Sequence, residues 1–217
     1  LALESGGVRG ILGATILCEL ETDVKIAIEH NFPHQSLDGF RIVDCFDLVT
    51  GSSTGALVAC VLTQKNSKET PYSILRLYQT QSEAIFKRSL CHMVRNGLGL
   101  WGSRYDPTHL QNICAQYLGQ SLLSECQPDL LVPVYDIIRH RTTAFYSLSV
   151  RSKTSSDVFL SDMAVAASSP PIFFPAVDLC NSEGKSMGMF ADGGISSINP
   201  SVLSVTFVAN ALGVSVD

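Results

Sequence analysis

The sequence predicts an α/β fold, a three-layer α/β/α sandwich around a mostly parallel central sheet. Two patterns support this prediction. Short apolar segments alternate with longer helical segments along the chain, which is the order found in βαβ units. The short segments are apolar at consecutive positions, as expected for strands that helices cover on both faces. We therefore expect one domain, residues 1–217, with its functional site at the carboxyl edge of the sheet.

The composition excludes several classes of protein. The 217 residues are enough for one domain with a substantial core, and because the chain begins inside an apolar segment we expect a domain of a longer protein. A net charge of −5 and the lack of a basic run argue against nucleic acid as a partner. No apolar run reaches the length of a transmembrane segment, and no signal peptide is visible.

The seven cysteines form no disulfide or zinc pattern. Their number is odd, they are widely spaced, and no C-x-x-C occurs. We expect buried free thiols in a reducing compartment, and neither a metal nor a cofactor. We expect a location in the cytoplasm or at the periphery of a membrane, unless the longer protein carries a targeting segment.

The first half of the chain is expected to contain two strands and three helices. In chain order they are strand 1–4, helix 11–29, strand 46–50, helix 56–62 and helix 71–86. Pro71 suits the first turn of its helix, where the missing N–H has no partner to lose. Residues 30–41 are polar and are expected to form a loop.

The second half is expected to contain three strands and three helices. In chain order they are helix 105–118, strand 130–138, strand 144–149, helix 161–167, strand 188–191 and helix 201–212. Asp106 and Ser161 are expected to cap the helices that begin near them. Arg139-His140-Arg141 is expected to form the tip of a hairpin.

Residues 87–104 allow two interpretations. The segment combines Lys87, Arg88, Arg95 and Arg104 with Leu, Met and Trp residues, which suits peripheral contact with an anionic membrane. The other interpretation is a surface loop. We favour the loop because no amphipathic period appears.

The run Gly51-Ser52-Ser53-Thr54-Gly55 lies between an apolar strand and an apolar helix. A G-x-S-x-G in this position is typical of a nucleophile elbow, in which a strained turn holds a reactive serine at the start of a helix. The alternative is an ordinary turn whose serine caps the helix. The flanking strand and helix favour Ser53 as a nucleophile.

The glycine-rich turn at residues 5–10 lies between the first strand and the first helix. Its backbone N–H groups form an anion site. A dinucleotide fingerprint fits poorly, because Ser5 stands where the first glycine belongs and the next strand does not end in an acidic residue. The other interpretation is an oxyanion hole, with N–H donors supplied by Gly6 and Gly7.

A nucleophilic serine needs a base. None of the five histidines follows Asp192 or lies in a strand-end turn that would direct its side chain into a site, so a Ser-His-Asp triad is poorly supported. Asp192 directly follows an apolar strand and precedes Gly193-Gly194, which allow close approach of a nucleophile. Taken alone, Asp192 also fits an ordinary Asp-Gly turn.

The three motifs occur in one order, and together they resemble the patatin-like phospholipase family. The family's Asp-Gly-Gly-Gly-x-Arg-Gly turn corresponds to residues 4–10, with Glu4 and Ser5 in place of the Asp and the first Gly. The G-x-S-x-G at residues 51–55 and Asp192-Gly193-Gly194 match the family in full. Residues 167–175 also resemble it, and the similarity extends from Leu3 to about Pro200.

The resemblance implies a patatin-like fold and a Ser–Asp dyad that cleaves fatty acyl esters of phospholipids or related lipids. Ser53 is then the nucleophile and Asp192 the base, while Gly6, Gly7 and Arg9 form the oxyanion hole. The motif glycines that shape the turns are Gly10, Gly51, Gly55, Gly193 and Gly194.

Three alternatives stay open at this point. Arg9 also fits a structural bridge to a carboxylate. An acyltransferase would use the same dyad, and a non-catalytic binding module would use neither residue. The expected partner is a lipid substrate.

Overall fold

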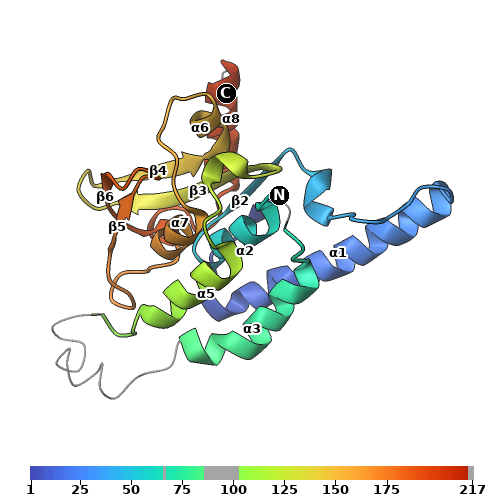
Figure 1. Cartoon of the computed structure of the whole chain (residues 1–217), viewed down its shortest axis with the longest axis horizontal. Helices are drawn as coiled ribbons and strands as arrows, with labels where there is room; N and C mark the ends of the chain where they lie inside the picture. The colour runs from blue at the N-terminus through green and yellow to red at the C-terminus, as the bar shows by residue number, and fades with distance from the viewer. Residues whose placement is uncertain (66, 86–102, 215–217) are drawn as a thin grey trace.

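The computed structural model describes residues 1–65, 67–85 and 103–214 (Figure 1). One six-stranded sheet has the order β1-β2-β3-β6-β5, with β4 paired to β3 outside this path. The strands are β1 (Ala2–Leu3), β2 (Leu48–Gly51), β3 (Asp129–Asp136), β4 (Arg141–Tyr146), β5 (Val177–Cys180) and β6 (Ser186–Asp192). The helices are α1 (Gly10–Asn31), α2 (Thr54–Thr63), α3 (Pro71–Ile85), α5 (Thr108–Leu118), α6 (Ser147–Arg151), α7 (Leu160–Ala167) and α8 (Ser201–Leu212).

Four of the six strands described run in the same direction. Strands β1, β2 and β3 pair in parallel, whereas β6 is antiparallel to β3 and β5 is antiparallel to β6. Strand β5 therefore runs with β3. The pairs β3–β4 and β5–β6 are antiparallel because short turns join them, and a parallel pair needs a long crossover. The expected mostly parallel sheet is confirmed, with antiparallel strands added to it.

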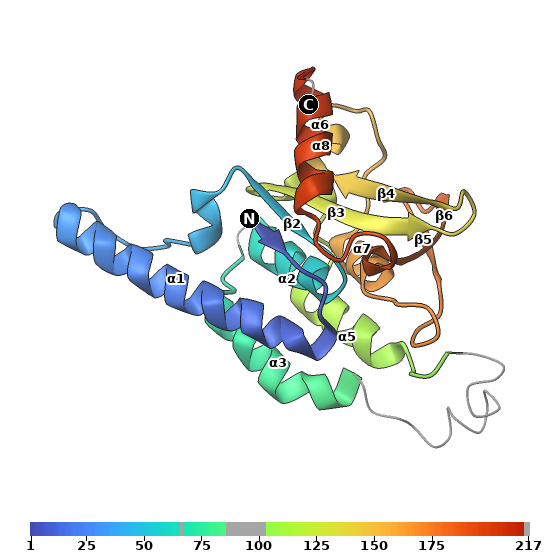
Figure 2. The same ribbon diagram turned by 180° about the vertical axis from the view of Figure 1, so that it is seen from behind.

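The helices lie on both sides of the sheet. Helices α2 and α7 pack against its central strands, α5 packs on α7, and α1 packs on α3. Seen from behind in Figure 2, α8 lies on the face turned away from α2. Residues Gly55 to Thr63 of α2 are all buried, which explains why this helix is apolar on every side. The predicted three-layer arrangement is confirmed.

Strand β3 is the branch point of the sheet. Its first residues pair with β2, up to Leu131 with Thr50, and its last residues pair with β6, beginning at Val134 with Asp192. Strand β4 pairs along residues 131–136 and so occupies the other edge. The carboxyl ends of β2 and β6 therefore face each other on one edge of β3, across Val132 and Pro133.

Most predicted elements are confirmed within a few residues, and α8 has the predicted bounds. Three predictions are wrong, and one strand was missed. Helix α5 begins at Thr108 and not at residue 105, although Asp106 does accept a hydrogen bond from the N–H of Thr108. Residues 147–149 begin α6 and do not extend β4. Ser161 lies inside α7 and caps nothing. Strand β5 was not expected.

Several predictions concern the surface and the thiols. The segment 87–104 lies almost entirely outside the described residues. In the described part of the chain, no helix has both the length and the apolar character required to cross a membrane. The six described cysteines are free thiols, of which Cys60, Cys114 and Cys126 are buried and Cys45 is exposed.

Candidate active site

Ser53 lies at the apex of the turn from β2 to α2. Its φ of 55° and ψ of −127° are unusual for a residue with a side chain and indicate a strained backbone. The glycines on either side are required by close packing. A Cβ on Gly51 would overlap the carbonyl of Gly55, and a Cβ on Gly55 would lie 2.5 Å from the carbonyl oxygen of Leu3. The G-x-S-x-G spacing therefore lets the turn fold tightly against β1.

Ser53 and Asp192 are in direct contact. The Ser53 hydroxyl donates a hydrogen bond of 2.6 Å to Oδ2 of Asp192, and both side chains are buried. The other carboxylate oxygen, Oδ1, accepts a bond of 2.7 Å from the N–H of Gly194. The carboxylate is thus held on one side by a main-chain donor and presents its other oxygen to the serine.

The burial of Asp192 changes its acidity. Burial raises its pKa from 3.8 to about 6, and the hydrogen bonds from Ser53 and from the N–H of Gly194 partly oppose that rise. A general base works best when its pKa lies close to the operating pH. The environment of Asp192 therefore suits proton transfer near neutral pH.

Gly193 fixes the position of Asp192 on the sheet. A Cβ at this position would overlap the carbonyl of Pro133 in β3. The chain therefore approaches β3 closely after β6 ends, at the gap between the ends of β2 and β6. This close approach brings Asp192 to Ser53, from which it is separated by 139 residues in sequence.

The glycine-rich turn lies beside the pair. Gly7 has a φ of 54°, a value that glycine adopts without strain, and Gly6 and Gly7 line the same cavity as Ser53. Neither N–H donates a hydrogen bond to the backbone of another described residue. The hydroxyl of Thr54 donates to the carbonyl of Gly7 at 3.2 Å, which ties this turn to the elbow.

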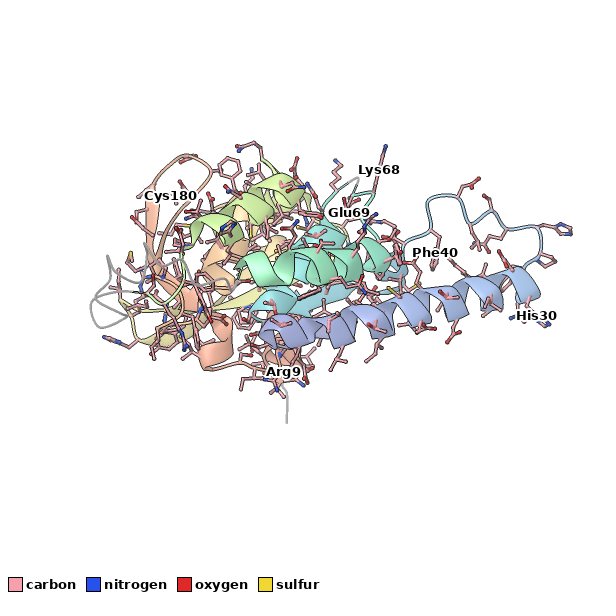
Figure 3. All side chains as sticks on the ribbon, turned by 90° about the horizontal axis from the view of Figure 1, so that it is seen from below. Arg9, His30, Phe40, Lys68, Glu69 and Cys180 are labelled. Carbon is pink, nitrogen blue, oxygen red and sulfur yellow. The ribbon has the colours of Figure 1, made fainter. Side chains whose placement is uncertain are left out.

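Arg9 lies at the beginning of α1, at the other end of the helix from His30 (Figure 3). Its side chain is exposed and lines the cavity. It forms no ion pair with any described carboxylate, so the alternative of a structural bridge has no support here. Gly10 lies against Tyr78, and a Cβ there would overlap the Tyr78 hydroxyl and force that side chain to shift.

Glu4 and Ser5, which replace the Asp and the first Gly of the family turn, both form hydrogen bonds to the chain that follows β6. The Oε1 of Glu4 accepts a hydrogen bond of 2.6 Å from the amide of Asn199, and the N–H of Ser5 donates to the carbonyl of Ile198 at 2.9 Å. Both contacts hold the turn against the chain that follows β6. The turn that carries Gly6 and Gly7 is therefore anchored at its first two residues.

The cavity above the pair has a volume of about 580 Å³. Ser53, Asp192 and the glycine turn form its polar end. The remaining wall is mainly apolar and includes Leu57, Val58, Ile74, Leu77, Leu110 and Phe174. A cavity of this kind suits a long aliphatic group whose polar end lies at the serine.

Tyr78 contributes a polar atom to the cavity wall. Its hydroxyl is buried and has no hydrogen bond of normal geometry to any described residue. Burial raises the pKa of Tyr78 to about 12, and the nearby Thr54 hydroxyl opposes that rise. The sequence analysis placed Tyr78 within the predicted helix 71–86 and did not identify it as a site residue.

Ser168 was also missed as a site residue. Its hydroxyl donates to the carbonyl oxygen of Ser53 at 2.8 Å, and the carbonyl of the next residue, Ser169, accepts from the N–H of Asp192 at 3.1 Å. These two residues therefore hold the backbones of both Ser53 and Asp192. The only available signal was the resemblance of residues 167–175 to the family, which specifies no contact.

No described histidine approaches the pair. His30, His34, His109 and His140 are exposed and do not line the cavity, and His92 lies outside the described residues. Among the residues that the structure describes, no group of His, Cys, Asp and Glu has the arrangement of a metal site. Among the described residues, the groups that hydrogen-bond to Ser53 are the carboxylate of Asp192, the hydroxyl of Ser168 and the N–H of Ala56.

The sequence is similar to proteins of one known family. The family model described as patatin-like phospholipase matches residues 1–202. The chain is 30% identical to Patatin-like protein 2 of Oryza sativa subsp. indica, over 96% of this chain and 52% of that protein. It is also 30% identical to Patatin-like protein 2 of Arabidopsis thaliana, over 98% of this chain and 53% of that protein.

A further relative is 24% identical over 95% of this chain and 53% of its own length, and is named Probable inactive patatin-3-Kuras 1 of Solanum tuberosum. The chain thus spans about half the length of the curated relatives that it matches.

Proposed function

The chain belongs to the patatin-like phospholipase family, and from that premise we propose that it is a serine-dependent lipid acyl hydrolase. Its substrates are fatty acyl esters of phospholipids or related lipids. The observation that carries the proposal is the hydrogen bond of 2.6 Å between Ser53 and Asp192 at the polar end of an apolar cavity. Such a cavity accepts an acyl chain and leaves its ester at the serine.

In the proposed reaction the hydroxyl oxygen of Ser53 attacks the ester carbonyl carbon, and its proton passes to Asp192. The N–H groups of Gly6 and Gly7 stabilise the oxyanion of the tetrahedral intermediate. Removal of one such donor typically lowers the rate about 10²–10³-fold. Asp192 then returns the proton to the leaving alcohol, which departs from an acyl-enzyme on Ser53.

The acyl-enzyme is hydrolysed by the reverse sequence. Asp192 takes a proton from water, the resulting hydroxide attacks the acyl carbonyl, and Ser53 leaves as its alkoxide and is reprotonated by Asp192. The raised pKa of Asp192 makes its carboxylate a stronger proton acceptor than an exposed aspartate. The steps use no cofactor, and all of the named groups belong to this chain.

Two alternative functions remain. An acyltransferase would use the same acyl-enzyme and pass the acyl group to an alcohol instead of water. A non-catalytic binding module is the second alternative, because one relative is named as probably inactive. The close contact of Ser53 with a buried carboxylate argues against the second, since a binding module has no use for it.

The test is an assay of the purified protein on a panel of phospholipids, galactolipids and acylglycerols, with Ser53→Ala as the matched control. We expect release of free fatty acid by the native protein and none above background by the variant. Equal release by both proteins would contradict the proposal. Repeating the assay with glycerol or a lysolipid as acceptor distinguishes hydrolysis from acyl transfer.

A further inference from the structure

Four exposed apolar side chains lie in two segments that border the catalytic cavity, residues 172–173 and 195–198. Ile172 is 78% exposed, Ile198 64%, Ile195 48% and Phe173 38%. Phe173, Ile195 and Ile198 also line the cavity, so they are exposed and lie at its mouth. Single exposed apolar residues are common, but a group of them around one opening indicates a binding surface.

Ile172 is held in an unfavourable conformation. Its φ is 73°, in the left-handed region that a β-branched residue rarely adopts. Two backbone hydrogen bonds fix it there: the N–H of Arg104 donates to the carbonyl of Ile172 at 2.8 Å, and the N–H of Tyr105 to that of Phe173 at 2.9 Å. The fold therefore maintains strain at a residue whose side chain contacts little of the protein, which indicates a role outside the fold.

Two arginines lie at the same opening. The guanidinium of Arg104 lies over the rings of Tyr105 and Phe173, 6.0 and 5.9 Å from their centres, and Arg9 lines the cavity from the start of α1. Both side chains are exposed. In a chain with a net charge of −5, this places positive charge beside the apolar rim. Guanidinium groups bind phosphate oxygens well, because their donors form a planar fork.

We infer that this rim docks the protein on the surface of an anionic phospholipid layer, with Ile172 inserted among the acyl chains. The rim consists of Ile172, Phe173, Ile195 and Ile198, with Arg9 and Arg104 beside it at the level of the phosphates. The inference rests on the proposed function, because it takes the cavity to be an acyl-chain site. Apolar residues that continue from the rim into the cavity let an acyl chain enter without crossing water.

The test measures binding, in a Ser53→Ala background, to vesicles made of equal parts phosphatidylcholine and phosphatidylglycerol. Vesicle sedimentation gives the partition coefficient. We expect Ile172→Asn to lower it about tenfold, since the variant loses the burial of one large aliphatic side chain. We expect Arg104→Gln to lower it about fivefold on these vesicles and to have little effect on phosphatidylcholine alone.

Matched controls lie elsewhere on the surface. Ile26 is 58% exposed near the C-terminal end of α1, and Lys68 is exposed in the loop before α3. Ile26→Asn removes an isoleucine side chain and Lys68→Gln removes a positive charge, both at positions outside the rim. We expect each variant to bind vesicles within about twofold of the parent, as is usual for exposed sites outside a binding surface.

Thermal melting separates lost binding from lost folding. Asparagine tolerates the left-handed conformation, so we expect Ile172→Asn to raise the melting temperature by about 2 °C while it weakens binding. No vesicle binding by the parent, or equal losses for Ile172→Asn and Ile26→Asn, would overturn the inference. Because binding needs no turnover, such a failure would leave ester hydrolysis untouched, and a failure of hydrolysis would leave this result valid.

Discussion

At the scale of single residues, Asp192 is placed for catalysis, but its ionised form lowers the stability of the fold. Its carboxylate is buried, and its pKa is raised from 3.8 to about 6. Between these two values the native state binds more protons than the unfolded state. The stability that this group contributes is therefore complete below about pH 4 and is lost as the pH rises through 6. The ionised base is thus held in place by the rest of the fold.

This cost predicts the effect of Asp192→Asn on stability. A pKa shift of about two units corresponds to about 3 kcal/mol of free energy of unfolding, which is lost when Asp192 ionises. Replacing the carboxylate with a neutral amide recovers part of this free energy. We expect the variant to melt about 5 °C higher than the native protein at pH 8 and at nearly the same temperature at pH 4. Melting curves at both pH values measure the difference. A variant less stable than the native protein at pH 8 would show that the ionised form is favoured by the fold.

Ser168 holds the strained backbone of Ser53 through its hydrogen bond to the Ser53 carbonyl, which the N–H of Ala56 also reaches. We expect Ser168→Ala to lower the free energy of unfolding by about 1 kcal/mol. We also expect a lower kcat for the folded variant, because the backbone of Ser53 is held less firmly. Ser169→Ala is the matched control, since its equally buried hydroxyl bonds only to Val165 within the preceding helix. Equal losses of kcat in both variants would show that the contact to Ser53 has no special role.

Sequence reasoning identified the residues that carry local patterns and missed the others. Ser53 lies in a five-residue motif, and Asp192 lies at the end of a strand before two glycines. Ser168 acts on a carbonyl 115 residues away, and the buried hydroxyl of Tyr78 faces the turn at Gly10 from another helix. Contacts of this kind depend on how helices and strands pack together, and they cannot be predicted from the spacing of residues in the sequence.

At the scale of elements, the elbow depends on the close packing of α2 against β1. Gly55 and Gly13 both lie in the first turn of a helix, but a Cβ at Gly55 would lie 2.5 Å from the carbonyl oxygen of Leu3, whereas a Cβ at Gly13 meets nothing. We expect Gly55→Ala to destabilise the protein by about 3 kcal/mol or more.

Gly13→Ala, the matched variant, should stabilise it by about 0.5–1 kcal/mol, since alanine favours a helix. Urea unfolding measures both changes. Similar changes in the two variants would contradict this account of the elbow.

The elements themselves differ in how well the sequence predicted them. Helices α1, α2 and α8 have long apolar or patterned segments and were predicted well. Strand β5 is four residues long, with an exposed Asp178 in the middle, and such a segment resembles a loop until β6 pairs with it. The branching of β3 between β2 and β6 was also hidden, because pairing partners are set by the whole sheet.

At the scale of the whole molecule, the sheet brings the carboxyl ends of β1, β2 and β6 to one place, and the helices leave an apolar cavity above it. The proposed mechanism takes its nucleophile, base and oxyanion donors from these strand ends. We therefore expect lipid hydrolysis to continue at an unchanged rate in excess EGTA. A loss of activity that added calcium reverses would show that an essential group is absent from this mechanism.

The central claim is that Ser53 is a nucleophile activated by Asp192, and its most direct test is covalent labelling with a fluorophosphonate across a pH series, with the adduct located by mass spectrometry. We expect one adduct, on Ser53, forming at a rate that rises with pH and is half-maximal near pH 6, where Asp192 ionises. Ser53→Ala should not be labelled, and Asp192→Asn should be labelled at a small fraction of the native rate. Absence of an adduct on Ser53, or labelling of Asp192→Asn at the native rate, would contradict the account.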